Sequence, residues 1–399
     1  MLSLLAEALA GSPRITAVGE PIPIESPGNW PRIFPRADGG WDVVTADTDS
    51  LVFQQLDGAF GRINGTERTI LDGTDLIDHT WATCPDGTRL HVGMGSRRSE
   101  QHTAEVRHFS AAFELLHESV AIDDDEHANI VDQAVICGDA FRGFPYLWIE
   151  EELDGFPRFV DLDEDGEATG EREFRLDDEN PLYFSPVGVS LLERGDVLWI
   201  FSNDLIFSTS FHVVAVNEDL EVVRDELVAV TDAPSFVFWP QGVVDVAGHT
   251  FLVYVKQDDR AGWVDSYGDL EIAHFDEDMD LVETVPVLEE GPGGGGFQPW
   301  LAYRDGELVV MYTADGAVNA VIPLTVDEDA PDPVDTGDPQ GDDTGEPPDT
   351  DADTDAPPAE DDDDPPREPV EPTRTCGVAT PVSAGALFLA LALGRRRRP

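Results

Sequence analysis

The chain has 399 residues and a formal net charge of −58, from 82 acidic and 24 basic residues. This charge opposes binding to a phosphate backbone and argues against nucleic acid as a partner. Three cysteines are too few for a disulfide scaffold and form no paired metal-binding motif. The apolar residues, 41% of the chain, are concentrated between residues 14 and 326, so this region is expected to fold.

The first segment, residues 1–13, is interpreted as a weak or truncated export signal. It reads MLSLLAEALAGSP and is largely apolar, but it has no basic residue at its start. Glu7 also interrupts the apolar run. Export is therefore expected mainly from features at the other end of the chain.

One pattern recurs six times in the apolar region: a strand, a tight turn with Gly or Asp, and a strongly apolar strand. The repeats begin at Trp30, His79, Asp132, Ser185, Trp239 and Phe297. Starts roughly 50 residues apart are typical of four-stranded propeller blades. Each interval also holds two further strands around a polar turn. We therefore predict an all-β fold, a six-bladed β-propeller over residues 14–326.

The last repeat shows only three strands, ending at AVIPLT. The segment 15–26, ITAVGEPIPIES, has the composition of a strand and is predicted to supply the fourth. An N-terminal strand in that place closes the ring and removes exposed sheet edges.

The repeats contain Asp-Gly turns followed by apolar strands, as in RDGELVVMYTA at 304–314. In this they loosely resemble the propellers of the sialidase and arabinanase-like superfamilies. The resemblance implies the fold and no active site, because the Asp-box of sialidases, S-x-D-x-G-x-T-W, does not occur in the sequence.

The innermost strand of each propeller blade begins near one mouth of the central channel, so residues there converge. In this chain those positions hold Trp30, Asp78 with His79, Asp132 with Gln133, Ser185, Trp239 with Gln241, and Gln298. Tryptophans beside amides and carboxylates suit a carbohydrate or another flat, polar ligand. In the alternative interpretation the tryptophans pack between blades and the polar groups cap strand ends.

Catalysis by a glycosidase needs two carboxyl groups about 5 to 10 Å apart. Arabinanase-like enzymes take one acid from the start of the first blade, where this chain has Trp30 and Pro31 instead. Asp78, Asp132 and Asp245 are the remaining catalytic candidates. In so acidic a domain, chance proximity of carboxylates is also expected.

Calcium is the one cofactor that the sequence suggests. Asp161, Asp163 and Asp165 alternate before Gly166, a spacing by which a tight loop turns carboxylates onto Ca²⁺. The same segment aligns with the hairpin FDEDMDLVE two repeats later, so an ordinary acidic β-turn is the alternative.

Cys84 and Cys137 lie 53 residues apart, close to one repeat, and each precedes the first turn of its blade. Equivalent positions on neighbouring innermost strands are adjacent around the channel, and an exported protein meets oxidising conditions. We therefore predict a disulfide between them, with two buried free thiols as the alternative.

Residues 327–375 are dominated by Asp and Glu, with Pro, Thr and Gly between them. Such a segment buries too little apolar surface to offset its ordering entropy, and its charges repel one another. We predict a disordered acidic linker.

The tail, residues 376–399, combines a Cys-Gly pair, an apolar run at 378–393 and the cluster 395–398 of four arginines. It resembles the myxobacterial C-terminal sorting signal, in which the cysteine is the processing position. That resemblance implies processing at Cys376. The apolar run is expected to contact a membrane as a helix, with the arginines on the cytoplasmic side. A plain tail anchor is the alternative.

Together these features predict an exported, surface-anchored propeller that binds an extracellular glycan or protein through one mouth of the ring. The alternatives are a secreted polysaccharide hydrolase of the arabinanase-like or sialidase-like kind, and a structural component of the cell envelope.

Overall fold

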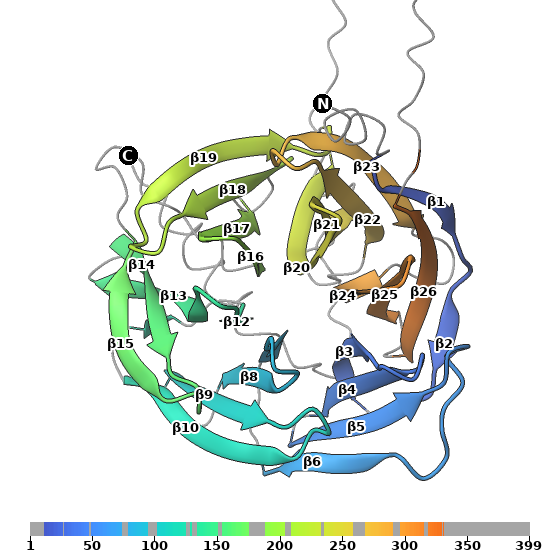
Figure 1. The fold of residues 1–399 in the computed structure, drawn as a ribbon, viewed down its shortest axis with the longest axis horizontal. Helices are drawn as coiled ribbons and strands as arrows, with labels where there is room; N and C mark the ends of the chain where they lie inside the picture. The colour runs from blue at the N-terminus through green and yellow to red at the C-terminus, as the bar shows by residue number, and fades with distance from the viewer. Residues whose placement is uncertain are drawn as a thin grey trace, which may run out of the picture.

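The six predicted blades are six antiparallel sheets arranged in a ring (Figure 1). The computed structural model describes residues 12–26, 28–47, 49–73, 79–94, 102–124, 128–129, 134–150, 154–174, 188–203, 209–232, 235–257, 268–289, 296–314, 318–328 and 330. All regular elements in these ranges are strands. The prediction of a six-bladed all-β propeller is confirmed.

In blades 1 to 5 the strand numbers rise from the channel outward, whereas in blade 6 the outermost strands are β1 and β2. Blade 1 holds β3 (Asn29–Pro35), β4 (Trp41–Asp47), β5 (Ser50–Leu56) and β6 (Arg68–Asp72); blade 2 holds β7 (His79–Thr83), β8 (Arg89–Met94), β9 (His102–Phe109) and β10 (Leu115–Asp124); blade 3 holds β12 (Ile136–Cys137), β13 (Arg142–Glu150), β14 (Asp154–Leu162) and β15 (Ala168–Glu173), with β11 (Ala128–Asn129) also paired to β13. Blade 4 holds β16 (Val189–Arg194), β17 (Val197–Asn203), β18 (Ser210–Val216) and β19 (Val222–Ala229); blade 5 holds β20 (Phe236–Val246), β21 (His249–Gln257), β22 (Asp269–Phe275) and β23 (Leu281–Leu288); blade 6 holds β24 (Gly296–Arg304), β25 (Glu307–Ala314), β26 (Val318–Asp327), β1 (Arg14–Val18) and β2 (Ile22–Ile24).

Blade 6 is completed by the N-terminal end of the chain, as predicted. Both β1 and β2 pair antiparallel with β26, and Arg14 lies opposite Asp327. The first and last strands of the fold therefore share one sheet. Because β26 ends at Asp327, the folded region extends one residue beyond the predicted boundary.

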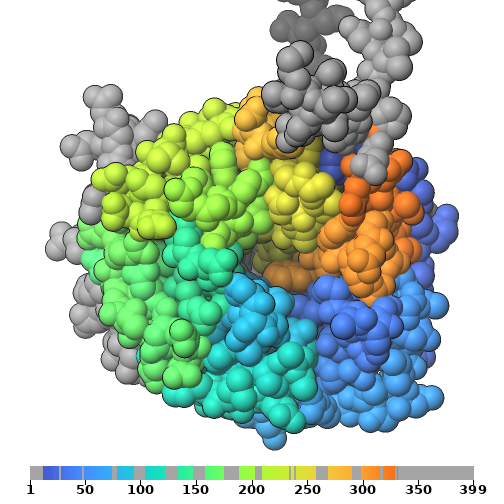
Figure 2. Space-filling view, in the orientation of Figure 1, coloured from blue at the N-terminus to red at the C-terminus, as the bar shows by residue number. Residues whose placement is uncertain are grey.

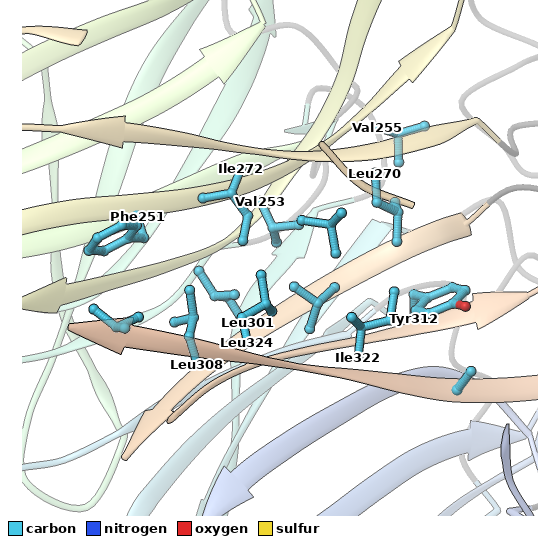
Figure 3. Packing of buried hydrophobic residues seen from close by; sticks show 14 of the residues in the cluster. Phe251, Val253, Val255, Leu270, Ile272, Leu301, Leu308, Tyr312, Ile322 and Leu324 are labelled. Atoms are coloured by element: carbon cyan, nitrogen blue, oxygen red, sulfur yellow. The ribbon is translucent and has the colours of Figure 1, made fainter. Parts of the chain in front are cut away.

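Six clusters of buried apolar residues hold the ring together, and each cluster combines two neighbouring blades. Figure 3 shows the one between blades 5 and 6, where Phe251 and Val253 of β21 face Leu301 of β24 and Leu324 of β26. Burial of each large apolar side chain contributes about 1.5–3 kcal/mol. Stability is thus distributed over the interfaces between blades.

The turn between the third and fourth strands repeats in blades 1 to 5, at 57–61, 110–114, 163–167, 217–221 and 276–280. Its first residue is Asp, Ser or Asn, whose side-chain oxygen accepts hydrogen bonds from the backbone N–H groups two and four positions later. Its fourth residue has a positive φ and is Phe60, Phe113, Gly166, Leu220 or Met279. The four apolar side chains are buried against the preceding blade. The acidic runs at 163–167, 217–221 and 276–280 therefore form turns, and the turns with an apolar fourth residue also join blades.

Arginines on the outermost strands bind the same turn of the next blade. Arg68 donates to the carbonyl of Ala112, and Arg172 donates to the carbonyl of Glu218. The guanidinium of Arg224 likewise reaches the turn of blade 5. A guanidinium offers five donors and can bind a carbonyl and a carboxylate at once, which an ammonium does less well.

The innermost strands all run in one direction, so the ring has a mouth face, where they begin, and a turn face, where they end. Polar and covalent links join neighbouring blades at the turn face. Blades 2 and 3 are joined there by the Cys84–Cys137 disulfide, with Cα atoms 4.8 Å apart, as the spacing predicted. Blades 4 and 5 are joined by the ion pair of Arg194 and Asp245 at 2.7 Å. Arg304 of blade 6 donates to the carbonyl of Gly40 in blade 1 at 2.7 Å.

Candidate functional site

Three consecutive blades begin their innermost strands with the same irregularity. The tripeptides are WPQ at 239–241 in β20, QPW at 298–300 in β24 and WPR at 30–32 in β3. In each, the pairing with the second strand shifts across these residues, which is a β-bulge. Proline suits a bulge because it has no N–H to donate to a strand ladder. Bulges occur frequently beside binding sites, where they redirect a side chain.

The residue before proline is strained in two of the three bulges. Trp30 has a φ of 50° and Gln298 a φ of 47°. A side chain of this size is rare at positive φ, and a following proline favours an extended backbone instead. Such a conformation costs about 1–3 kcal/mol per residue and is found preferentially at functional sites. The mouth face of blades 5, 6 and 1 is therefore the candidate site.

Side chains connect blades 6, 1 and 2 at this mouth. Arg32 is buried, with its guanidinium 4.7 Å from the ring centre of Trp300 in blade 6. It also donates hydrogen bonds to the carbonyl of Pro31 and to that of His79 in blade 2, each at 3.1 Å. Trp30 lies next to His79, with ring centres 6.3 Å apart. Residues from three blades thus meet around the Arg32 guanidinium.

Blades 4, 5 and 6 meet just as closely along the same rim. The Ser190 hydroxyl of β16 donates a hydrogen bond to the Pro240 carbonyl of β20. A Cβ atom on Gly242 would come within 2.4 Å of the Leu301 backbone nitrogen, so only glycine allows β20 and β24 to approach this closely. In the space-filling view the ring surrounds a hollow at its centre (Figure 2).

The histidine of this site is neutral at physiological pH. Burial and the neighbouring Arg32 cation lower the pKa of His79 to about 3. Its Nδ1 accepts a hydrogen bond from the Trp81 indole at 3.0 Å, so Nε2 carries the proton and donates to the Trp30 carbonyl at 3.0 Å. His79 therefore anchors the backbone of the strained Trp30. Behind it lies His91, and burial holds the pKa of this histidine well below its usual value.

Two amides at the mouth face are buried without satisfying their oxygens. Gln241 is 7% exposed and Gln298 is 6% exposed, and neither Oε1 atom has a hydrogen-bond partner within the described structure. Burying an acceptor without a partner costs about 1–3 kcal/mol. Both residues flank a bulge proline, so the unpartnered amide oxygens and the strained backbone occur in the same tripeptides.

The structure describes some of the predicted site residues and leaves others outside its ranges. Trp30, Gln241 and Gln298 lie in the bulges at the mouth face, and His79 opens the regular strand β7 beside them. Trp30 also packs against the apolar cluster between blades 1 and 2, as the alternative interpretation of the tryptophans described. The Trp239 backbone belongs to β20, in the position equivalent to Trp30 and Gln298, and its side chain is outside the description. Asp78, Asp132, Gln133 and Ser185 also lie outside the described residues.

The catalytic candidate Asp245 lies away from the mouth. It is near the end of β20, on the turn face, where it pairs with Arg194 and accepts a hydrogen bond from the Gly248 N–H at 3.1 Å. Gln241 stands toward the other end of the same strand. Of the three catalytic candidates, Asp245 is therefore placed away from the mouth, and its carboxylate joins two blades.

The predicted calcium loop is also corrected. Asp161 lies on β14, where its two oxygens accept hydrogen bonds from Arg172 at 2.6 Å each. Asp163 caps the following turn by accepting from the N–H groups of Asp165 and Glu167. The three carboxylates do not converge, and the described residues contain no group of three side chains suited to a metal ion. The alternative, an acidic β-turn, describes this segment.

Sequence reasoning missed Arg32, Trp300 and His91. The first two occupy the position after the bulge proline in WPR and QPW. Comparison of these tripeptides with WPQ would have identified the position. His91 lies on the second strand of blade 2, and the pairing of β7 with β8 brings it beside His79 on the first strand.

No family model matches the chain, and no curated protein matches it. Among solved structures, a protein of unknown function from Dyadobacter fermentans superposes with a TM-score of 0.54 at 11% identity, over 79% of this chain and 99% of the other. A subtype N10 neuraminidase-like protein of A/little yellow-shouldered bat/Guatemala/060/2010 gives 0.46 at 8% identity, over 79% and 99% of the two chains. Trypanosoma rangeli sialidase gives 0.44 at 11% identity, over 79% and 58%. The first similarity shows the propeller fold alone.

The predictions for residues 1–11, for nearly all of the 327–375 linker and for the tail with Cys376 concern segments outside the described residues. Across the ranges that are described, no helix is long and apolar enough to cross a membrane.

Proposed function

We propose that this protein is an exported, surface-anchored propeller that binds an extracellular ligand at the mouth face, with a glycan favoured over a protein. The observation that supports binding is the repeated proline bulge in blades 5, 6 and 1, with strained residues at Trp30 and Gln298. Strain and unpaired polar groups that recur at one place in neighbouring repeats are costly, and a ligand that uses them explains why they are kept.

The chemistry of the site favours a glycan. Tryptophan presents a flat apolar face with a polar edge, and amides pair with hydroxyl groups. Trp30, Gln298 and Gln241 supply these groups on adjacent blades. Display at the cell surface is proposed from the tail, in which Cys376 resembles the processing position of a sorting signal.

The proposal is tested with the full chain on an array of extracellular polysaccharides, oligosaccharides and peptides. Trp30→Ala and Gln298→Ala are each expected to weaken binding of the same ligand at least tenfold. Trp199→Ala, in the interface between blades 4 and 5, and the exposed Asn64→Ala are controls for loss of a tryptophan and of an amide. Binding that none of the mouth substitutions alters would contradict the proposal.

The hydrolase alternative draws on Asp78 and Asp132. A release assay on each bound polysaccharide, repeated with Asp78→Asn and Asp132→Asn, separates it from binding alone. Release of reducing ends that both substitutions abolish would favour the enzyme.

A further inference from the structure

We infer that the mouth of this propeller selects an uncharged sugar and rejects anionic ones, which rests on the proposed function and specifies its ligand. The inference follows from the hydrogen-bonding needs of the two buried glutamines and from the way the positive charge at the mouth is already used.

The glutamines need a hydrogen-bond donor. The Oε1 atoms of Gln241 and Gln298 are buried, and within the described structure neither has a partner. A carboxylate, sulfate or phosphate group offers acceptors only and would face these oxygens with repulsion. A hydroxyl group donates to an amide oxygen and also accepts from an amide N–H. Sugar hydroxyls therefore supply the donor that each Oε1 lacks.

The cation described within the site, Arg32, is already bound by the protein. Arg32 is 1% exposed, lies over the Trp300 ring and donates to the carbonyls of Pro31 and His79. An anionic ligand gains strongly from a guanidinium only when it can form paired hydrogen bonds with it. Two backbone carbonyls and an aromatic ring occupy the places that such a ligand would need.

Neither the neighbouring histidine nor the protein as a whole attracts an anion. His79 uses Nδ1 as an acceptor for Trp81 and Nε2 as a donor to Trp30, so both ring nitrogens are engaged. The net charge of −58 repels anions at long range and lowers their rate of encounter. An uncharged ligand is not affected by this field.

The bulges also provide a platform for a sugar ring. Trp30 is half-buried at the mouth, and its backbone is fixed by His79. Gln298 follows at the equivalent position of blade 6, and Trp239 occupies that position in blade 5. The partly exposed Trp30 ring beside the Gln298 amide combines a surface for stacking on a sugar ring with a group that bonds its hydroxyls.

The test compares neutral and anionic oligosaccharides with the full chain at pH 7 and 0.15 M salt, by calorimetry. The neutral probes are cellohexaose, xylohexaose and mannohexaose; the anionic probes are 3′-sialyllactose and hexagalacturonate. At least one neutral probe is expected to bind, and at least tenfold more tightly than either anionic probe. Gln298→Leu and Gln241→Leu, which keep the bulk of the side chain, are each expected to weaken that binding at least tenfold.

Gln54→Leu is the matched control. Gln54 is 1% exposed and neither polar atom of its amide has a partner within the described structure, but it lies on the third strand of blade 1, in register with Val43. It therefore shares the burial of the mouth glutamines without their position. The Leu substitution is expected to leave sugar affinity unchanged within twofold, and thermal melts of all variants verify folding.

Three results would overturn the inference, and they differ in what they say of the proposed function. Tighter binding of an anionic probe that Trp30→Ala and Gln298→Leu abolish would refute the ligand class and leave the mouth as the binding site. Neutral binding that Trp30→Ala abolishes but both Gln→Leu variants leave intact would refute the role of the amides. If no probe binds, the inference fails, while the wider array with the Trp30→Ala comparison still decides the proposed function.

Discussion

Acidification should destabilise this protein through His79, and substitution of that histidine by glutamine should remove the effect. Burial and the Arg32 cation lower the pKa of His79 to about 3, whereas an unfolded histidine titrates near 6.5. The stability that neutral His79 contributes is complete above pH 6.5 and is lost as the pH falls from 6.5 toward 3, because the unfolded chain then binds a proton that the folded chain excludes.

The magnitude follows from the size of that pKa difference. Each pKa unit corresponds to about 1.36 kcal/mol, so the 1.5 units between pH 6.5 and pH 5 amount to about 2 kcal/mol. The hydrogen-bond geometry also opposes protonation of folded His79. A proton added at Nδ1 would point at the Trp81 N–H group, from which this atom now accepts a hydrogen bond. The free energy of unfolding should therefore fall by about 2 kcal/mol more in the wild type than in His79→Gln between pH 7 and pH 5.

Urea unfolding of the full chain, followed by circular dichroism at both pH values and at constant ionic strength, measures this difference. The other titrating groups are common to both proteins and largely cancel in the comparison. Equal losses for wild type and His79→Gln, within about 0.5 kcal/mol, would refute the reasoning, since additivity of independent sites holds to that precision.

Three other predictions concern features of the ring. Replacing Cys84 and Cys137 together by Ala should lower stability by as much as about 4 kcal/mol, because the disulfide closes a loop with a sequence separation of 53; melts with and without reductant should differ for the wild type only. Asp163→Ala should cost about 1–2 kcal/mol through the two backbone N–H groups that lose their acceptor, while the exposed Asp165→Ala should be nearly neutral in the same urea titration. Millimolar Ca²⁺ should leave the melting midpoint unchanged relative to EDTA, because Arg172 already neutralises the Asp161 carboxylate beside this turn. A rise of several degrees would support the calcium-loop interpretation instead.

The repeat architecture was predictable because the innermost strands are marked in the sequence. Trp30, Trp239 and Phe297 each open a segment in which an apolar strand follows a short turn, and the intervals match one blade. The spacing of Cys84 and Cys137 predicted their pairing for the same reason, since one repeat of sequence is one step around the ring. Local pattern and global fold agree in these places.

The details of the mouth were not predictable in the same way. A bulge interrupts the alternation of a strand, so the direction of Arg32 and Trp300 does not follow from counting residues. The positive φ values of Trp30 and Gln298 contradict the preference of a residue before proline and are enforced by packing around them. The role of Asp161 depends on Arg172, which the register of β14 with β15 brings beside it.

The contrast between the two faces of the ring favours a ligand-binding role over a purely structural one. At the turn face the ends of neighbouring innermost strands are joined by a disulfide, by the ion pair of Arg194 and Asp245 and by the Arg304 hydrogen bond to Gly40. At the mouth face the innermost strands of blades 5, 6 and 1 instead begin with proline bulges that hold the strained Trp30 and Gln298, and with the amide oxygens of Gln241 and Gln298, which have no partner among the described residues. Positive φ values also occur at the turn face, at Phe60, Phe113, Leu220 and Met279, but there they belong to the repeated turn and its hydrogen bonds. An envelope component selected for strength alone has no reason to keep the strain of the proline bulges. A protein that binds at its mouth does, because a ligand recovers that cost, and the links at the opposite face hold the ring together in its absence.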